Sequence, residues 1–380
     1  MDFNLNKVQK DIMRAAKDFA NGEFPQVAQE FDRQETFDLS LWKKACELGF
    51  VGTFIPEAYG GAGLGYLEHS LITEEFWAVD PGCGQAILAA TFGAELLILF
   101  ASEEQKQRLL PPLADGLDHL ATAITEPDAG SDTTQAVTAA VKDGDSWVIN
   151  GAKMFITNGS TAGNILVFCL TDPEHPSPHQ RHSFILVERD RPGFSATKLK
   201  GKLGIRASDT TEMAFNEVRV PQENLVGQEG RGFAQLMEFF NRTRLHICAQ
   251  GVGLMRACLE DSVRHVKNRR QFGQPLASFQ ATQFKIAEMA TRMRAARGLY
   301  YNAAWLVDQG KVDHGLIAMA KWFSAQGAVQ AADEALQMHG GYGYLDEFRV
   351  QRLYRDAKIL EIYEGAKEIE KLIVARTILG

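Results

Sequence analysis

The residues best suited to chemistry lie near the C-terminus, where residues 362–365 read Ile-Tyr-Glu-Gly. Glu364 stands between two helical patterns, one over residues 353–360 and one whose apolar residues recur at helical spacing over 369–373. Flanked by an isoleucine and a tyrosine, the carboxylate is expected to be partly shielded from water. Such shielding raises the pKa toward the range where a carboxylate works as a base near neutral pH. The same position also suits a glutamate in the first turn of the last helix, where negative charge is favourable without any chemistry.

Two stretches rich in hydroxyl groups are candidates for binding a ligand. Residues 125–132 read Thr-Glu-Pro-Asp-Ala-Gly-Ser-Asp, and their hydroxyls, glycine and turn-exposed backbone N–H groups suit a phosphate or the edge of a flavin. Residues 153–159, Lys-Met-Phe-Ile-Thr-Asn-Gly, place an aromatic ring near a threonine, which suits a planar ring system. Taken singly, the two stretches are equally typical of a Pro/Gly turn and of a strand end.

Two further stretches combine cations or glycines with a helix end. Residues 268–273, Asn-Arg-Arg-Gln-Phe-Gly, end a long helical pattern with cations that complement the helix dipole and that also suit bidentate recognition of a pyrophosphate. Residues 338–344, Met-His-Gly-Gly-Tyr-Gly-Tyr, allow a backbone to approach a ligand closely or simply separate two helices. His339 alone is more typical of a structural histidine than of a catalyst.

The elements that must position these residues begin with helices over residues 1–120. Apolar runs over 39–48, 67–78 and 86–100 have helical composition. The glycines of residues 56–65 follow GxGxG spacing without a βα repeat, so we interpret this stretch as a turn rather than a dinucleotide site. One face of the first helix is predicted from Val8, Ile12, Ala15, Ala16 and Phe19.

The pattern changes to strands over residues 121–230 and returns to helices over 231–380. A hairpin is predicted with its turn at Asp143-Gly144, and further strands over 154–157, 165–170, 183–188 and 212–220. Helices follow over about 233–268, 279–308 and 314–338, with a final pair around Glu364. The sequence therefore predicts an α+β multidomain chain with an N-terminal helical domain (1–120), a middle β domain (121–230) and a C-terminal four-helix-type bundle (231–380).

Composition excludes several classes of partner. The chain has 380 residues, 45% of them hydrophobic, and a formal net charge of -8, which offers no broad basic field for a nucleic acid. We find no signal-peptide pattern and expect no apolar run long enough to span a bilayer, and so no membrane partner. The cysteines form no CxxC pair, which favours reduced thiols in a cytoplasmic compartment over a disulfide or metal framework. They are Cys46, Cys83, Cys169, Cys248 and Cys258.

The ordered set TEPDAGSD, KMFITNG, RRQFG, LQMHGGYGY and IYEG resembles the acyl-CoA dehydrogenase family, and the resemblance runs over essentially the whole chain. It implies the three-domain fold, bound FAD, and usually a homotetramer. It also implies an acyl-CoA substrate and electron-transferring flavoprotein as the acceptor of the electrons.

Residue by residue, the resemblance implies that Glu364 is the catalytic base. The residues lining the flavin would be Ile124, Thr125, Gly130, Ser131, Phe155 and Thr157. The ADP half of FAD would be reached across a subunit interface by Arg269, Gln271, Phe272, Gln337 and Gly341, and Gln280 matches another cofactor-binding position near that site. The substrate would contact Ser131, Asn241, Arg244, Tyr363, Gly365 and Thr91, with Asn241 and Arg244 near the CoA moiety.

The chemistry implied by the family is the α,β-dehydrogenation of a thioester to a 2,3-enoyl-CoA. The α-hydrogen is a weak acid, so the enolate-like charge must be stabilised as the proton leaves. In the family, the backbone N–H of the glutamate and a flavin ribityl hydroxyl bind the thioester oxygen, and the flavin N5 accepts the β-hydride.

The sequence departs from the family pattern at several positions. Phe155 stands where tryptophan is commoner, and Ala366 replaces the usual threonine, which removes a hydroxyl near the flavin. Asn241 stands where some relatives have aspartate. In a minority subgroup the base lies on the helix that opens the C-terminal domain, but Thr243 occupies that position here, which leaves Glu364 as the candidate.

Substrate choice is expected to depend on residues 83–92, which resemble the element that forms the wall of the acyl pocket. This stretch contains no arginine, so the charge of a free dicarboxylate such as a glutaryl group would be unpaired. The small Ala89, Ala90 and Thr91 suit a short, branched or alicyclic acyl group such as cyclohexane-1-carboxyl, or merely close helix packing.

Three other functions are compatible with the same pattern. They are an enoyl-CoA reductase that runs the reaction backwards, a non-catalytic flavoprotein that serves as an assembly factor, and a helical scaffold without cofactor. The intact IYEG glutamate argues against the second.

Overall fold

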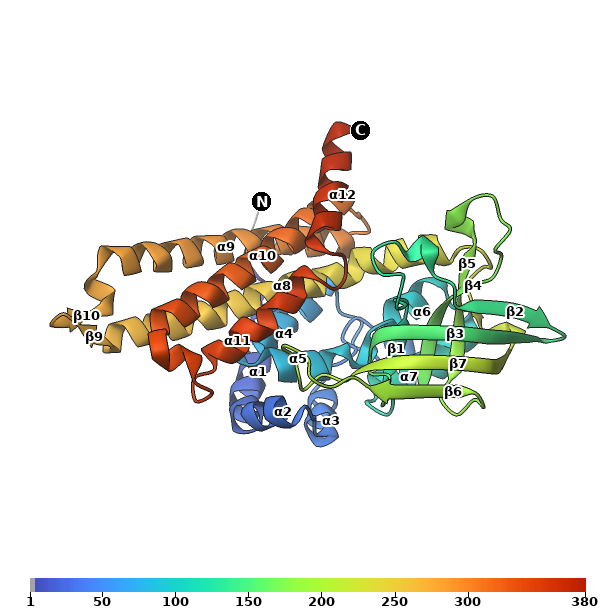
Figure 1. Ribbon diagram of the computed structural model, residues 1–380, viewed down its shortest axis with the longest axis horizontal. Coiled ribbons are helices and arrows are strands. Elements are labelled where there is room, and N and C mark those ends of the chain that lie inside the picture. The colour runs from blue at the N-terminus through green and yellow to red at the C-terminus, as the bar shows by residue number, and fades with distance from the viewer. Residues whose placement is uncertain (1–3) are drawn as a thin grey trace.

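The computed structural model describes residues 4–380, arranged as helices, then a sheet, then helices along one long axis (Figure 1). The predicted order of the three parts is confirmed. The last helix before the sheet ends at Ala114 and the first strand begins at Leu120; the last strand of the sheet ends at Val226 and the next helix begins at Gly232. Domain limits at residues 120 and 230 stay a prediction within these gaps.

The N-terminal part is helical, and its central helix α4 is buried along almost its whole length. In α1 the predicted apolar face is wrong at two positions, because Val8 is 58% exposed and Ala15 is exposed, while Ala16 and Ala20 are buried. Residues 56–65 form a turn with one short 3-10 segment. The helices are α1 (Lys7–Glu23), α2 (Ala28–Gln34), α3 (Leu39–Glu47), α4 (Tyr66–Val79), α5 (Pro81–Leu88), α6 (Ala94–Phe100) and α7 (Glu103–Ala114).

The apolar run Pro81–Phe100 corrects the expectation that no stretch could span a bilayer. By length and composition it qualifies, with a mean hydropathy of 1.7. It is nevertheless broken between α5 and α6, where Gly93 has φ +113, and 78% of its most apolar window is buried inside the chain. Its hydrophobicity therefore builds the core between the N-terminal helices and the sheet.

The middle part is an eight-stranded sheet with the order β6-β7-β3-β2-β4-β5-β8, and β1 pairs in parallel with β4. The predicted hairpin is confirmed, with Val141 opposite Val148. Residues 154–157, predicted as a separate strand, are the end of one long strand, and β1, β6 and β8 were not predicted. The strands are β1 (Leu120–Ala123), β2 (Ala139–Asp143), β3 (Ser146–Thr157), β4 (Asn164–Leu170), β5 (His182–Glu188), β6 (Phe194–Lys198), β7 (Thr210–Pro221) and β8 (Leu225–Val226).

Strand β3 is continuous because two irregularities bend it instead of ending it. Its register against β7 shifts near Gly151 and again between Lys153 and Ile156. Gly151 has φ +149, and a Cβ there would lie 2.6 Å from Thr138 Oγ1, so only glycine fits. At the second irregularity Phe155 has φ +61 and its side chain is turned to solvent, 64% exposed.

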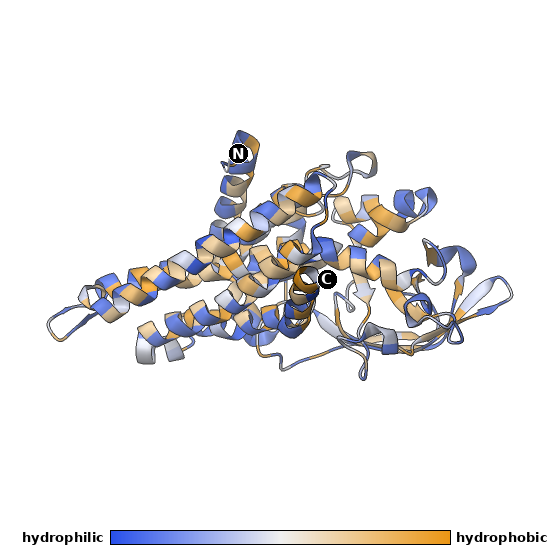
Figure 2. Ribbon diagram, turned by 90° about the horizontal axis from the view of Figure 1, so that it is seen from above, coloured by the Kyte–Doolittle hydropathy of each residue, from blue (hydrophilic) through white to orange (hydrophobic). Residues whose placement is uncertain are grey.

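The C-terminal part consists of long helices that lie side by side in Figure 1 and reach from the sheet to the far end of the molecule. In Figure 2 these helices carry hydrophobic and hydrophilic residues in alternation, as helices with one buried side do. Close approach of α8 and α10 uses Gly251, where a Cβ would lie 2.9 Å from Ser324 O. The elements are α8 (Gly232–Asn268), β9 (Arg270–Gln271), β10 (Gln274–Pro275), α9 (Gln280–Asp308), α10 (His314–His339), α11 (Val350–Ala357) and α12 (Lys367–Leu379).

All five cysteines are free thiols. Four of them are buried, and burial raises the pKa of Cys248 and Cys169 to about 12. These thiols are therefore packing residues rather than nucleophiles.

Candidate active site

The loop that carries Glu364 joins the 3-10 segment Lys358–Glu361 to α12, as the sequence predicted. Glu364 has φ +55 and Gly365 has φ +100. The left-handed conformation of a non-glycine residue carries strain of about 1–3 kcal/mol and is found mainly at functional sites. A Cβ at Gly365 would lie 2.1 Å from Glu370 Oε1, so a glycine is required directly after the glutamate.

The carboxyl of Glu364 is desolvated although the residue as a whole is partly exposed. Burial raises its pKa to about 7, as predicted from its apolar neighbours, and a hydrogen bond from Thr243 opposes that rise. Thr243 Oγ1 donates to Glu364 Oε2 over 2.6 Å. Glu364 and Thr243, the two positions considered for a base from the sequence, thus face each other, one with a carboxyl and the other with a hydroxyl. A carboxyl with this pKa is suited to accept a proton near neutral pH.

A small cavity of about 70 Å³ opens beside Glu364. Of the residues predicted from the sequence, it brings together Glu364, Tyr363, Thr91 and Thr157, which come from the C-terminal loop, the N-terminal helices and strand β3. All three parts of the chain therefore meet at this cavity. Its other lining residues are Phe54, His69, Thr73, Gln85, Leu88, Ala89, Phe92, Glu95, Thr243, His246, Ile247 and Gln250.

One wall of this cavity is unexpectedly polar. Glu95 is 2% exposed, and burial raises its pKa to about 7. His246 lies 3.5 Å from it, and burial lowers the histidine pKa to about 3, so the imidazole is neutral. On the other side of the cavity, Tyr363 OH donates to Gln250, whose amide donates to Gln85 over 3.0 Å. Of these side chains, only Tyr363 and Gln85, the latter within the predicted pocket wall of residues 83–92, were expected at the site from the sequence.

A larger groove of about 770 Å³ contains Asn241 and Arg244, both predicted to lie near a CoA moiety. Arg244 also holds the base loop, because its Nε donates to Glu364 O over 2.9 Å. The groove is lined by Leu99, Phe100, Gly227, Gln228, Arg231, Ala234, Gln235, Met237, Glu238, Asn241, Arg244, His314 and Ile373.

The loop that follows β1 is shaped by a buried ion pair. Lys153 Nζ, fully buried, lies 2.8 Å from Glu126 Oε1 and donates to Ile124 O over 2.9 Å. Glu126 in turn accepts hydrogen bonds from the backbone N–H groups of Val137 and Thr138. Ile124 is buried and Thr125 is partly buried, whereas Gly130 and Ser131 lie exposed on the outer turn. The loop and the end of β3 are thereby fixed together.

The remaining predicted residues lie at a corner far from this loop. Hairpin β9–β10 lies at the opposite end of the molecule from the sheet (Figure 1). Its Phe272 is 92% exposed, and the Arg269 guanidinium lies over the Tyr342 ring, 5.3 Å from its centroid. We call this group the arginine corner; its predicted members are Arg269, Gln271, Phe272, Gln280, Gln337 and Gly341, all exposed. One chain does not bring the corner and the Ile124–Thr157 surface together.

Comparison with known proteins shows the family to which the chain belongs. It matches the models of the N-terminal, middle and C-terminal domains of acyl-CoA dehydrogenases over residues 6–117, 121–218 and 230–379. The chain belongs to the acyl-CoA dehydrogenase family. It is 39% identical to acryloyl-CoA reductase (NADH) of Anaerotignum propionicum, covering 100% of this chain and 96% of that protein. It is also 39% identical to the short-chain specific acyl-CoA dehydrogenase of Clostridium acetobutylicum, covering 99% of both.

Solved structures extend this similarity to the whole fold. A chain in a structure of the electron transferring flavoprotein of Acidaminococcus fermentans has a TM-score of 0.97 at 39% identity and covers 100% of both chains. A structure described as the FAD complex of PigA has a TM-score of 0.95 at 31% identity and covers 100% of this chain and 99% of the other. The protein is thus an FAD-dependent oxidoreductase of the acyl-CoA dehydrogenase family.

The residues present fit FAD. Phe155 exposes 64% of its surface next to Thr157, and a Cβ at Gly130 would meet no atom within 4 Å, so a planar ring has both an aromatic face and open space. At the arginine corner the guanidinium and the exposed Phe272 suit a pyrophosphate and a purine. When bound, FAD supplies the acceptor for a hydride.

Proposed function

We propose that this member of the family catalyses the α,β-dehydrogenation of a short, branched or alicyclic acyl-CoA, with Glu364 as the base. The observation that carries the proposal is the geometry of the base loop. A desolvated carboxyl with a pKa of about 7 stands in a strained left-handed conformation at the mouth of an acyl-sized cavity. A scaffold without cofactor or an assembly factor has no need of such a strained and desolvated carboxylate.

In the proposed reaction the Glu364 carboxylate removes the α-proton of the thioester. The electron pair of that C–H bond forms the new C=C bond as the β-hydride leaves, which gives the 2,3-enoyl-CoA and a protonated Glu364; bound FAD would supply the acceptor for the hydride. The Thr243 hydroxyl stabilises the carboxylate before the transfer. Arg244 and Asn241 hold the CoA moiety in the groove of about 770 Å³, which orients the acyl group toward the cavity.

The size and charge of the cavity support a compact, uncharged acyl group. A volume of about 70 Å³ leaves no room for a long chain. A terminal carboxylate, as in a glutaryl group, would meet the carboxyl of Glu95 and find no arginine among the residues that line the cavity. Cyclohexane-1-carboxyl-CoA therefore belongs in the substrate panel together with straight and branched C4 thioesters.

The flavin surface and the arginine corner support a multi-chain enzyme. Because the hairpin that carries the arginine corner lies at the end of the molecule away from the sheet (Figure 1), we propose that each FAD is held by two copies, in a homotetramer as is usual in the family. We also propose that electron-transferring flavoprotein is the acceptor, in the cytoplasm. This assignment is supported by the family and by the similarity to the Acidaminococcus chain.

The decisive experiment is an anaerobic titration of the purified protein, followed by its visible spectrum. The panel is butyryl-, isobutyryl-, cyclohexane-1-carboxyl-, octanoyl- and glutaryl-CoA. We expect bleaching of the oxidised flavin band by one of the first three and little or none by the last two. A flavin band that no thioester bleaches would refute the dehydrogenase assignment, and bleaching by octanoyl- or glutaryl-CoA alone would refute the substrate class.

A second candidate is an enoyl-CoA reductase, which the similarity to acryloyl-CoA reductase favours. The same residues serve both directions, with protonated Glu364 donating the α-proton. The two are separated by assaying the enzyme with an artificial electron acceptor and an acyl-CoA, and with chemically reduced flavin and the matching enoyl-CoA. A faster turnover in the second assay, under matched concentrations, would assign the reductase.

A further inference from the structure

Three helices converge beneath the Glu364 loop and hold its backbone with buried charges. Lys321 on α10 is fully buried, and its Nζ donates to the carbonyls of Tyr363 over 2.9 Å and of Gly365 over 2.5 Å. Arg244 on α8 donates to the carbonyl between them, that of Glu364. Three successive carbonyls of the loop thus point at two cations.

The charge of these cations is balanced by Glu370, the fully buried residue of α12. Its Oε1 lies 3.1 Å from Arg244 Nη2. Within residues 4–380 neither carboxyl oxygen accepts a hydrogen bond, so Glu370 acts here through its charge. The cations Arg244 and Lys321 oppose the rise in its pKa that burial causes.

We propose that Lys321 and Glu370 are positioning residues, which clamp the backbone of residues 363–365 and so hold Glu364 and Gly365 in the left-handed conformation that aims the Glu364 carboxyl. This inference rests on the proposed role of Glu364 as the base. Three carbonyls drawn to one side turn the intervening peptide N–H groups toward the other side, which under the proposed function would leave them free to bind the thioester oxygen. Without the clamp, the φ of +55 at Glu364 has no support from its own side chain, because glutamate disfavours that region.

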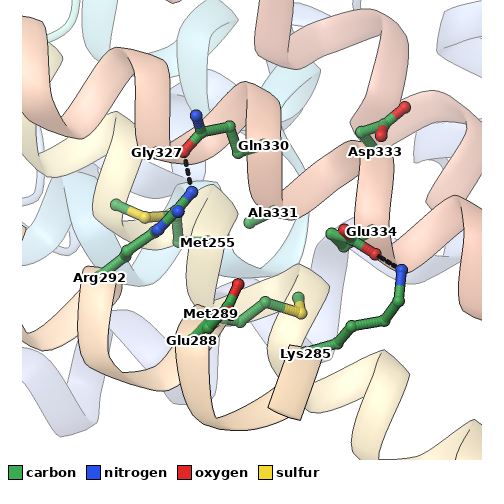
Figure 3. Close-up of a pocket in the computed structure, with 10 residues that line it drawn as sticks. All are labelled: Met255, Lys285, Glu288, Met289, Arg292, Gly327, Gln330, Ala331, Asp333 and Glu334. Atoms are coloured by element: carbon green, nitrogen blue, oxygen red, sulfur yellow. Dashed lines mark hydrogen bonds and ion pairs between the residues drawn. The ribbon is translucent and has the colours of Figure 1, made fainter. Parts of the chain in front are cut away.

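A control lysine lies at a different interface of α10, the one with α9. Figure 3 shows a separate pocket between α9 and α10, in which Lys285 pairs with Glu334. The Lys285 side chain is 36% exposed and touches none of the loop residues. Lys285→Met therefore removes one lysine from an ion pair at this interface without disturbing the clamp.

The test compares Lys321→Met, Glu370→Gln and Lys285→Met as FAD-loaded enzymes. Lys321→Met should lower the rate of flavin bleaching about 10²-fold, the loss expected from a displaced catalytic group, and should speed amide hydrogen exchange in the 359–366 peptide. Lys285→Met should match the wild type in both. The proposed clamp is wrong if the flavin of Lys321→Met is bleached at a rate within threefold of the wild type and its 359–366 peptide exchanges amide hydrogens at the wild-type rate.

The pH profile separates a positioning role from simple packing. The charged groups facing Glu364 are Arg244 from α8, Lys321 from α10 and Glu95 from α6, with Glu370 of α12 behind the two cations. The other titratable groups at the cavity are Tyr363 of the loop, His246 of α8 and His69 of α4, and burial lowers the pKa of both histidines and raises that of the tyrosine. Removing a cation should move the acid limb of kcat/KM to higher pH in Lys321→Met, and removing an anion should move it to lower pH in Glu370→Gln. The double variant should regain the wild-type limb while its rate stays low, because the carbonyl hydrogen bonds remain lost. Shifts of the same sign in both single variants would overturn the proposal.

Two readouts keep the test of the clamp separate from a failure of the proposed function and from a failure of Lys321→Met to fold. If no thioester bleaches the wild-type flavin, the proposed function fails while hydrogen exchange still decides the clamp. If Lys321→Met does not fold, Glu370→Gln decides by the direction of its pH shift, because the amide is close in size to the carboxyl and removes only its charge. No shift in that variant would then reject the clamp.

Discussion

The base loop and the arginine corner differ in how much of their geometry a single chain supplies. Around Glu364 the hydroxyl of Thr243, the guanidinium of Arg244 and the ammonium of Lys321 come from two long helices, and the carboxyl is desolvated. At the corner, Phe272 is 92% exposed on a hairpin of two short strands. The first site is fixed by its own fold, whereas the second presents side chains outward.

This difference indicates which part of the proposed reaction a single chain can position and which part needs another copy of the chain. Proton abstraction needs a group held at a defined position, and the chain surrounds it with buried hydrogen bonds and charges. Cofactor binding at the corner needs a surface that another copy completes. Phe272 (φ +51) and Gly273 (φ +78) form the two-residue turn of the hairpin, a turn type that has positive φ at both positions, and this turn holds the aromatic ring in solvent.

The largest effect should come from Glu364→Gln, which tests whether the buried region is the catalytic one. The amide keeps the shape of the side chain but cannot accept the α-proton, so the rate of flavin bleaching should fall roughly 10²–10⁴-fold while FAD stays bound. Stopped-flow absorbance at the flavin band measures this rate.

The control for this variant is Glu368→Gln, an exposed glutamate in the first turn of α12. It should bleach at the wild-type rate. Equal losses in both variants would mean that the loop is merely fragile, and an unimpaired Glu364→Gln would remove the base from this site.

At the corner, Arg269→Ala should weaken FAD binding about 10–100-fold, the loss of a hydrogen bond to a charged group, while the bleaching rate of the remaining holoenzyme stays unchanged. Equilibrium dialysis and the oligomeric state in solution measure the effect. The matched control is Arg270→Ala, the neighbouring arginine, whose guanidinium donates to Gly273 O within its own hairpin. If Arg270→Ala releases FAD and Arg269→Ala does not, the assignment within the corner is wrong.

The buried carboxyl of Glu95 in the cavity should destabilise the folded chain at high pH, whereas none of the six predicted residues of the arginine corner is an acid. The folded-state pKa of Glu95, about 7, lies above its ordinary value of 4.5, so the folded chain holds this proton more tightly than the unfolded chain. Its favourable contribution is complete below pH 4.5 and is lost as the pH rises through about 7. Glu95→Gln should therefore be more stable than the wild type at pH 8, by on the order of 3 kcal/mol, and near-equal at pH 5.

Thermal unfolding of the two holoenzymes at pH 5 and pH 8 measures this difference. The control is Glu103→Gln, which changes an exposed glutamate in the first turn of α7. This variant should show no gain in stability at pH 8. A Glu95→Gln variant that is less stable than the wild type at pH 8 would show that other groups in the cavity stabilise the charged carboxylate of Glu95.

Much of the fold was predictable because it depends on local patterns. Helical composition located α3, α4, α9 and α10 to within two residues, since a glycine or aspartate lies directly at or near one end of each. The pattern failed where the chain is irregular. Strand β3 continues through Phe155 only because a register shift absorbs the bend, and the two-residue β8 is held by pairing with β5. Such features depend on partners distant in sequence.

The residues of the site were predictable only where they match a sequence motif of the family. Glu364 and its raised pKa followed from its neighbours in sequence, whereas Lys321, Glu370 and Glu95 lie on helices whose sequence gives no sign of chemistry. A lysine in an alanine-rich helix is usually at the surface, and only the packing of α10 against α12 shows that Lys321 is buried beneath the loop. No local signal marks such a group.

The smallest effect tests the single hydrogen bond to the base. Thr243→Val removes the donor that lowers the pKa of Glu364, so the acid limb of kcat/KM should move up by about one pH unit, the equivalent of one hydrogen bond to a charged group. At pH 7 the rate should then fall about fivefold, because fewer molecules hold the carboxylate, and the two enzymes should converge above pH 9. Thr243→Ser keeps the hydroxyl and should retain the wild-type limb. A Thr243→Val enzyme that is slower by the same factor at every pH would show that the threonine contributes packing and not the hydrogen bond. The base would then be held in place only by the contacts of Arg244 and Lys321 to the backbone of residues 363–365.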